Sequence, residues 1–263
     1  MEDVKVSVIG LGVMGEAIVK VLIEAGLSQS NIAVKEKRSE RLEEVKSKYK
    51  LISEDLAESK IIFLAVKPQD LDSGLESIRR EVQSETLIVS IVAGVSCSRV
   101  ESYIGKNSRV IRVMPNTALI VKEGVSAISR GRTAQDEDLA WVEGIFSKSG
   151  KTLTIDESLM DAVTATSGSG PAYFFGLIEA MTKASIRLGL SEQDSKLLVN
   201  QTLIGAAKMI EESGKDAGTL RKEVTSPNGT TAAALTSFES SGWEEIVYEA
   251  MKAAKDRSQE LSN

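Results

Sequence analysis

The chain has 263 residues, of which 42% are hydrophobic, and its formal net charge is −6. This length is sufficient for two domains with buried cores, and the negative charge argues against a general binder of nucleic acids or acidic membrane surfaces. The sequence contains no histidine and a single cysteine, Cys97. It therefore excludes histidine bases, histidine triads and thiolate metal clusters, and we expect no metal cofactor.

The same cysteine count bears on the compartment. Cys97 has no second cysteine to pair with, which favours a reducing environment, and no histidine to activate it, so we interpret it as structural. The sequence contains no run of 18 uninterrupted apolar residues, so no membrane span is expected. The first strand pattern begins at the start of the sequence and leaves no room for a signal peptide, so we expect a cytoplasmic protein.

A glycine-rich turn separates the first strand and helix patterns. Residues 4–9 form an apolar, β-branched run, residues 16–25 carry apolar residues at helical spacing, and Gly10, Gly12 and Gly15 between them give G-x-G-x-x-G. In this context the turn binds a dinucleotide pyrophosphate. Two glycines let the backbone approach phosphate, the third lets the helix pack against the strand, and the helix start faces the negative charge. We predict that these glycines bind a cofactor.

Strand and helix patterns alternate through the first 155 or so residues, which predicts a mainly parallel sheet. The run 61–66 is continuously apolar, so we expect a central strand buried on both faces. The remaining elements of this region follow in chain order: strands at 31–36, 86–91, 109–114, 125–128 and 152–155, and helices at 39–48 and 136–148.

After Asp156 alanine and leucine replace the β-branched runs. Helices are expected at 171–189, 192–212 and 242–260. We therefore predict a dinucleotide-binding domain over 1–156 and a helical domain over 157–263. These helices carry apolar residues on more than one face, which favours a homodimer over a monomer whose helices pack only on each other.

The cofactor choice depends on the segment after the second strand. Glu36 lies 21 residues beyond Gly15, where an acidic residue usually binds the ribose of NAD. Lys37 and Arg38 follow it, and residues 35–41 carry a local charge of +2, which suits the 2′-phosphate of NADP. We expect NADP(H), with NAD possible; the alternative is that the basic residues form a solvated face.

Further candidates lie at the ends of later strands, where ligands bind in open α/β sheets. Lys67 and Pro68 follow one strand and are predicted to flank the adenosine half of the cofactor. Ala93 and Gly94 end the next strand on the same rim, and Asn116 follows another, where its amide would reach the nicotinamide or the substrate.

The helical region contains two turns rich in hydroxyl groups and glycine, at residues 167–173 and 224–231. Each precedes a helix pattern, so each is expected to present free N–H groups and hydroxyls to a carboxylate. The alternatives are an ordinary N-cap for the first and an Asn-Gly turn for the second.

Together these segments resemble the pyrroline-5-carboxylate reductase family over nearly the whole chain. The resemblance rests on Met14-Gly15, Val66-Lys67-Pro68-Gln69, Met114-Pro115-Asn116-Thr117, Ser167–Tyr173 and Val224–Thr231. Two departures are Ala118, where the family usually has proline, and Asn228, where it usually has a second glycine. Asparagine is the residue other than glycine that best tolerates a left-handed backbone, so we expect the second turn to survive.

The resemblance implies a Rossmann-type N-terminal domain, an all-α dimerisation domain, and reduction of Δ1-pyrroline-5-carboxylate to L-proline by NAD(P)H, the last step of proline biosynthesis. It implies that Met14 and Val66 belong to the cofactor site, that the active site forms between subunits, and that Thr231 binds the ring nitrogen. The residues implied to line the substrate carboxylate and ring are Ser226, Gly229, Thr230 and Thr231.

Two other functions are weighed against this one. One is a 3-hydroxyacid dehydrogenase of related architecture. The pattern of that group has a lysine base four residues after the helix-start glycine, but here Phe174 occupies that position. A non-catalytic NAD(P)-binding regulator would keep the N-terminal glycines and would not need the polar turns of the helical region.

Overall fold

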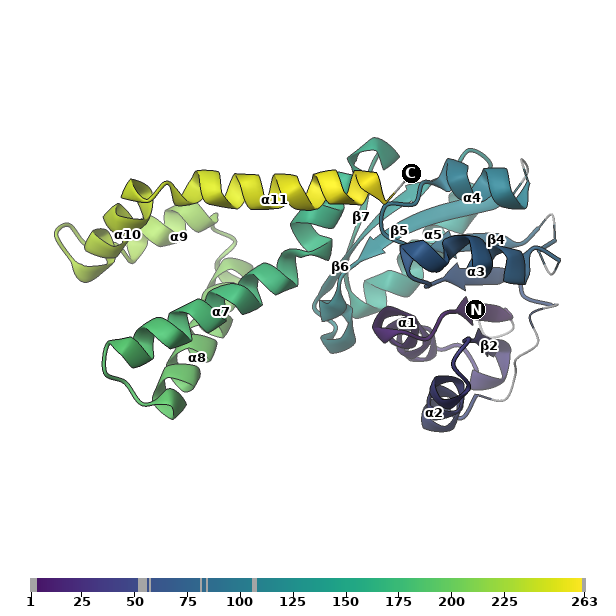
Figure 1. Cartoon of the computed structure of the whole chain (residues 1–263), viewed down its shortest axis with the longest axis horizontal. Helices are drawn as coiled ribbons and strands as arrows, with labels where there is room; N and C mark the ends of the chain where they lie inside the picture. The colour runs from purple at the N-terminus through teal and green to yellow at the C-terminus, as the bar shows by residue number, and fades with distance from the viewer. Residues whose placement is uncertain are drawn as a thin grey trace. The chain divides into compact units, whose positions relative to one another are not determined.

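The computed structural model describes residues 4–51, 56, 58–80, 82–83, 85–105 and 108–261. The chain divides into two compact units (Figure 1). One, the sheet unit, comprises the residues up to Pro171 together with those from Ala253 onward, and the other, the helical unit, comprises Ala172–Lys252.

Within the described residues, seven strands form one sheet in the order β2-β1-β3-β4-β5-β6-β7. The strands are β1 (Val6–Ile9), β2 (Ile32–Lys35), β3 (Ile61–Leu64), β4 (Leu87–Ser90), β5 (Arg109–Pro115), β6 (Gly124–Arg130) and β7 (Gly150–Thr154). All neighbours pair parallel except β5 and β6. This confirms the predicted mainly parallel sheet. The antiparallel pair arises because only the 3₁₀ turn Thr117–Val121 joins β5 to β6, too short for a parallel crossover.

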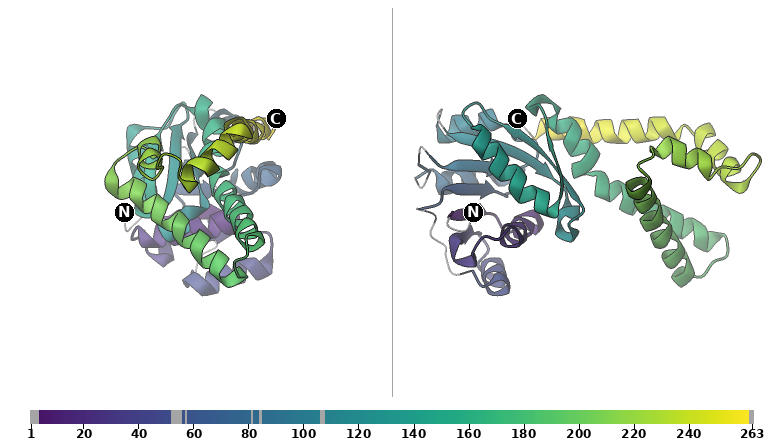
Figure 2. Two further views of the ribbon diagram at one scale, coloured as in Figure 1. Left: turned by 90° about the vertical axis from the view of Figure 1, so that its left-hand side faces the viewer. Right: turned by 180° about the vertical axis from the view of Figure 1, so that it is seen from behind.

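Helices cover both faces of the sheet (Figure 2). Val8 and Phe63 contribute to one apolar cluster, with residues of α1 and α5, whereas Ile9 and Leu64 contribute to the other, with residues of α3 and α4. This alternation follows the two-residue period of a strand. The helices are α1 (Val13–Glu24), α2 (Ser39–Tyr49), α3 (Leu71–Ile78), α4 (Cys97–Ile104) and α5 (Asp136–Phe146), with 3₁₀ turns Gln29–Asn31, Pro68–Asp70, Ser147–Ser149 and Glu157–Leu159.

The strand order places a switch point between β1 and β3, because the chain leaves β1 toward β2 on one side and reaches β3 on the other. Ile9 at the end of β1 pairs with Lys35 of β2 and Leu64 of β3. The three carboxyl ends therefore lie side by side at one edge of the sheet, which is the position where open α/β sheets bind ligands.

The last residues of the sequence return to the sheet unit. Ser258 donates a hydrogen bond from Oγ to Oδ1 of Asp161 at 2.8 Å. Gly94, which follows β4, has φ +76°, and a Cβ there would lie 2.5 Å from the carbonyl oxygen of Ser258 and 2.8 Å from Cβ of Leu261. The end of the chain therefore packs directly on the backbone after β4.

The helical unit has few buried residues: across its 81 positions, all of them described, only Ser195, Val199 and Leu220 are buried. Ser191 caps α8 by accepting a hydrogen bond from the N–H of Asp194. The helices of the helical unit are α7 (Gly170–Arg187), α8 (Glu192–Ser213), α9 (Ala217–Glu223), α10 (Thr230–Ser240) and α11 (Trp243–Glu260). The first residues of α7 and the last residues of α11 belong to the sheet unit. The prediction omitted α9.

The long helix predicted at 171–189 is confirmed as α7 (Gly170–Arg187), but the expectation of free N–H groups and hydroxyls at residues 167–173 is wrong. The short helix α6 (Met160–Val163) continues into a π-helical turn, Thr164–Gly168, and then directly into α7. The N–H of Ser169 donates to the carbonyl of Thr164 at 2.8 Å, and the hydroxyl of Ser167 donates to the carbonyl of Val163 at 3.2 Å. These groups are therefore engaged within the helix and offer no open helix start.

Candidate functional site

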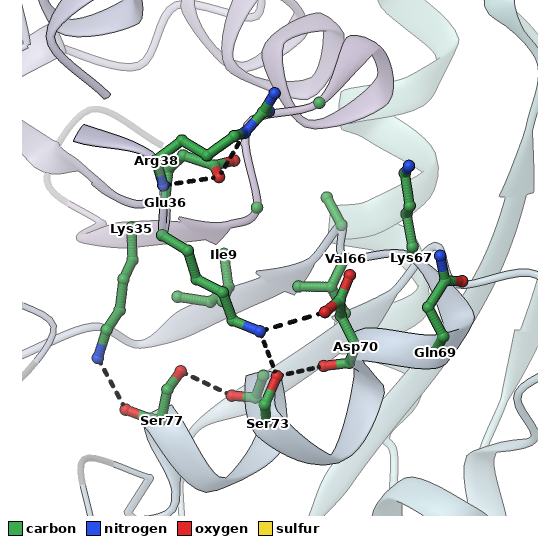
Figure 3. Close-up of a pocket in the computed structure, with 15 residues that line it drawn as sticks. Ile9, Lys35, Glu36, Arg38, Val66, Lys67, Gln69, Asp70, Ser73 and Ser77 are labelled. Atoms are coloured by element: carbon green, nitrogen blue, oxygen red, sulfur yellow. Dashed lines mark hydrogen bonds and ion pairs between the residues drawn. The ribbon is translucent and has the colours of Figure 1, made fainter. Parts of the chain in front are cut away.

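A pocket of about 450 Å³ lies at the carboxyl ends of β1, β2 and β3 (Figure 3). It is formed by the glycine turn, the segment after β2, and the start of α3. It brings together seven of the predicted cofactor residues: Gly10, Gly12, Glu36, Lys37, Arg38, Val66 and Lys67.

The three glycines of the turn are required for different reasons. Gly10 has φ +90°, and a Cβ there would lie 2.8 Å from the carbonyl oxygen of Ala65. A Cβ on Gly15 would lie 1.8 Å from the carbonyl oxygen of Gly10, so this glycine permits α1 to pack against the turn. A Cβ on Gly12 would meet nothing within 4 Å. The space in front of Gly12, at the start of α1, is therefore open to a phosphate.

Glu36 holds the backbone of the turn, and Figure 3 shows its carboxylate beside Arg38. Its Oε2 accepts a hydrogen bond from the N–H of Leu11 at 2.9 Å, and its Oε1 accepts from the backbone N–H and Nε of Arg38 at 3.1 and 3.2 Å. Burial acts to raise the pKa of Glu36, but the hydrogen bonds from Arg38 and Leu11 outweigh it and leave that pKa below the ordinary value. The carboxylate is therefore ionised near neutral pH and accepts three hydrogen bonds.

Arg41 fixes the other side of the same peptide. Its Nε donates to the carbonyl oxygen of Leu11 at 2.8 Å, and its guanidinium pairs with Glu16 in the first turn of α1. Burial acts to raise the pKa of Glu16, but hydrogen bonds from Lys48, Arg41 and Tyr49 lower it overall. Both polar groups of Leu11 are thus held by side chains, which fixes the turn before any ligand binds.

Cations line the side of the pocket nearest α3. Nζ of Lys37 donates to Oγ of Ser73 at 2.8 Å and to Oδ1 of Asp70 at 3.2 Å. Nζ of Lys35 donates to the carbonyl of Ser77 at 3.0 Å (Figure 3). The lining contains four cationic and two acidic side chains, a surplus of positive charge that suits a phosphorylated ligand.

The other predicted cofactor residues do not line this pocket. Asn116 accepts a hydrogen bond at Oδ1 from the N–H of Val125 at 3.3 Å, and Gly94 lies against the end of the chain. The roles of Met14, Gly15, Pro68, Ala93, Gly94 and Asn116 in ligand binding stay predictions.

Sequence reasoning omitted the α3 side of the pocket. Gln69, Asp70, Ser73 and Ser77 lie there beside Lys35 and Lys37. Spacing after a glycine turn does not identify such residues, because they reach β2 only through the order in which the strands pair. The sequence offered only the alternation of strands and helices; in the structure β2 and β3 pair on opposite sides of β1, which brings the segments that follow them to the same edge of the sheet.

The predicted substrate turn lies in the helical unit. The N–H of Gly229 donates to the carbonyl of Ser226 at 3.0 Å, and Asn228 between them has φ +59°, the left-handed conformation expected of it. A Cβ on Gly229 would lie 2.3 Å from Oγ of Ser226. Gly229 is the N-cap of α10, so the N–H groups of Thr230 and Thr231 stand in its first turn, where a helix has no internal acceptors for them.

The described residues contain no group of three or more acidic, cysteine or histidine side chains placed to hold a metal ion. Cys97 is buried, and its N–H donates to Oε1 of Glu157 at 2.7 Å. Burial raises the pKa of its thiol far above the ordinary value, and the carboxylate of Glu157 adds to that effect. Over the described part of the chain, no helix combines the length and apolarity needed to cross a bilayer.

A parallel sheet with a glycine turn at its switch point, an open helix start and a cationic pocket defines a dinucleotide-binding protein of the Rossmann type. Residues 157–261 match the family model described as pyrroline-5-carboxylate reductase dimerisation, and residues 5–94 match one described as NADP oxidoreductase, coenzyme F420-dependent. The chain belongs to the pyrroline-5-carboxylate reductase family. A pyrroline-5-carboxylate reductase from Methanosarcina acetivorans is 42% identical over 99% of both chains.

Solved structures agree with this assignment. The structure of a pyrroline-5-carboxylate reductase from Coxiella burnetii matches with a TM-score of 0.88 and 32% identity, over 99% of both chains. A pyrroline carboxylate reductase from Plasmodium falciparum, solved with NADP bound, matches with a TM-score of 0.88 and 31% identity, over 100% of both chains. The likeness therefore extends over both units of the fold.

Proposed function

We propose that the protein reduces the C=N bond of Δ1-pyrroline-5-carboxylate with NAD(P)H to give L-proline, the last step of proline biosynthesis. The observation that carries the proposal is the 42% identity to a pyrroline-5-carboxylate reductase over 99% of both chains. The pocket at the switch point of the sheet supports it, because its open helix start and surplus of positive charge suit a nicotinamide dinucleotide.

The cofactor supplies a hydride when it is bound. Gly10 and Gly12 would hold its pyrophosphate at the start of α1, Lys67 and Pro68 would flank the adenosine, and Val66 would belong to the same site. Lys37 and Arg38 would bind a 2′-phosphate, which makes NADPH the expected cofactor and NADH the possible one. Met14, Gly15, Ala93, Gly94 and Asn116 complete the proposed cofactor set.

The turn at the start of α10 would bind the substrate. The N–H groups of Thr230 and Thr231, with the hydroxyl of Ser226 and the backbone of Gly229, suit a carboxylate. The hydroxyl of Thr231 would bond to the ring nitrogen. That nitrogen can already carry a proton, so the reduction needs no strong base, and a chain without histidine can carry it out. Positioning alone supplies up to about 7–11 kcal/mol of barrier reduction in favourable cases.

The helical unit supports a homodimer formed through residues 157–263, the second proposed domain after 1–156. Its apolar side chains are largely exposed in the single chain; Phe175, for example, is 62% exposed. Such faces are typical of an interface, and the matched dimerisation model covers the same region. The single buried cysteine supports a cytoplasmic location.

The assay that tests the function follows NAD(P)H oxidation with pyrroline-5-carboxylate, and NAD(P) reduction with a panel of 3-hydroxyacids. We expect turnover with the cyclic imine and none with the 3-hydroxyacids, since Phe174 replaces the lysine base of that class. Turnover of 3-hydroxyacids alone would overturn the proposal in favour of a dehydrogenase. Dinucleotide binding without either reaction would favour a non-catalytic regulator.

A further inference from the structure

The acidic residue after β2 is committed to the glycine turn. In the general dinucleotide fold such a residue accepts the ribose hydroxyls. Here both oxygens of Glu36 are occupied, one by the N–H of Leu11 and the other by Arg38, and its side chain is 9% exposed. Three of the roughly four hydrogen bonds that a carboxylate can accept are thus made within the protein. Glu36 is therefore placed to position the turn, and its neighbours carry the charges that can distinguish the two cofactors.

The next residue is the one whose charge enters the pocket. Nζ of Lys37 lies 2.8 Å from Oγ of Ser73 and 3.2 Å from Oδ1 of Asp70, both at the α3 side of the pocket. Asp70 thus forms an ion pair with Lys37, the cation most suited to bind a 2′-phosphate. The side chains of Lys37 and Asp70 are 66% and 43% exposed, so a ligand can reach both.

We propose that Asp70 determines how strongly the protein prefers NADPH over NADH, by competing with the 2′-phosphate for the ammonium group of Lys37. The inference rests on the proposed cofactor site. When a ligand carries the phosphate, Lys37 must exchange Asp70 for it, and the nearby carboxylate opposes the new charge. When a ligand lacks the phosphate, Asp70 keeps Lys37 neutralised and no cation is left unpaired in the pocket.

The test measures binding of two cofactor fragments by isothermal titration calorimetry, so it does not depend on turnover. The fragments are adenosine 2′,5′-bisphosphate and 5′-AMP, which differ in the 2′-phosphate. Asp70→Asn should tighten the bisphosphate about three- to tenfold, a range set by the partial exposure of the pair, and change AMP less than about twofold. Lys37→Met should weaken the bisphosphate about tenfold or more and spare AMP.

Two controls separate this mechanism from a general charge effect. Asp72→Asn makes the same change two residues away, where the carboxylate pairs with Arg99 outside the pocket, and should leave the ratio of the two affinities unchanged. In the Lys37→Met background, the gain from Asp70→Asn should shrink, because its effect passes through Lys37. The proposal is overturned if Asp70→Asn leaves the ratio of the two affinities unchanged or changes it no more than Asp72→Asn does. It is also overturned if Asp70→Asn tightens the bisphosphate as much in the Lys37→Met background as in the unchanged protein.

Glu36→Gln tests whether Glu36 positions the glycine turn or binds the ribose. If Glu36 positions the turn, both fragments weaken by the same factor; if it binds the ribose, AMP alone weakens and the proposal falls. Thermal unfolding of each variant identifies any that fails to fold, and Glu36→Asp then takes the place of Glu36→Gln. Fragment binding that follows this pattern in a protein inactive on pyrroline-5-carboxylate would refute the proposed reaction and leave this inference standing.

Discussion

The two units of this chain differ in how completely they bury their apolar side chains. In the sheet unit, helices on both faces enclose the strands, and Phe63 is completely buried among rings such as Trp141 and Phe146, with centroids 6.4 Å away. In the helical unit, Phe175 is 62% exposed and Phe238 is 52% exposed. The first unit encloses its own core, whereas the second leaves large apolar side chains exposed in the single chain, as is typical of an interface.

The largest expected effect tests the dependence of the helical unit on a second copy. Phe175→Glu places a charge in the proposed interface, and a two-fold interface contains that charge twice. Burying an unpaired charge costs about 3–5 kcal/mol per site, so the dimer dissociation constant should rise on the order of ten-thousandfold or more. Light scattering during gel filtration measures the change. Val121→Glu, at a residue 68% exposed in the sheet unit, is the matched control and should leave the dimer intact. A dimeric Phe175→Glu variant would break the comparison.

A cavity in the sheet unit should have the next largest effect. Phe63→Ala removes a fully buried ring and should lower the free energy of unfolding by about 3–5 kcal/mol, whatever the protein concentration. Phe238→Ala removes a half-exposed ring that contacts Trp243, and its effect on the melting temperature should depend on protein concentration. Urea unfolding and melting curves at two concentrations test the pair. A loss under about 1 kcal/mol for Phe63→Ala would contradict the self-contained core.

The start of α10 offers a smaller, local test inside the helical unit. Thr231→Ala should reduce kcat about a hundredfold, as expected for one hydrogen bond to the reacting group, with the melting temperature unchanged. Thr236→Ala lies on the same helix at an exposed position and should keep full activity. Steady-state kinetics with pyrroline-5-carboxylate would remove Thr231 from the site if the two variants behaved alike.

The smallest effect uses Cys97 as a reporter of the sheet unit. Burial raises the pKa of its thiol, so almost no thiolate exists at pH 8, and a disulfide reagent should label the native protein only over hours. Guanidinium should make labelling immediate. In the Phe175→Glu variant the thiol should stay protected, because the sheet unit keeps its own core. Rapid labelling of that variant would show that the two units are not independent in stability.

The sequence predicted the sheet well because its signals are local. The apolar run at residues 61–66 contains the buried strand β3, and Gly15 is required by a contact within the turn itself, with the carbonyl oxygen of Gly10. The open polar turn predicted at residues 167–173 was wrong because serine and glycine also fit a π-helical turn, in which the hydroxyl of Ser167 donates to a carbonyl of the preceding turn. Local sequence does not distinguish these outcomes.

The contacts within the pocket could not be predicted from the sequence, because they depend on how the strands pair. The position of Glu36 was predicted from its spacing, but its orientation toward Leu11 depends on how β2 pairs with β1. Asp70 and Ser73 lie more than thirty residues from Lys37 and meet it only because β3 pairs on the other side of β1. No motif records such a contact.

The contact between Gly94 and the end of α11 has a consequence for the order of synthesis. Residues 253–261 complete the sheet unit, yet they are translated after the whole helical unit. The rest of the sheet unit is therefore synthesised before residues 253–261 exist, and Asp161 lacks its hydrogen bond from Ser258 until then. A fragment that stops before residue 253 would lack this part of the sheet unit. An independent sheet unit would have to be made by circular permutation or by supplying the missing peptide in trans.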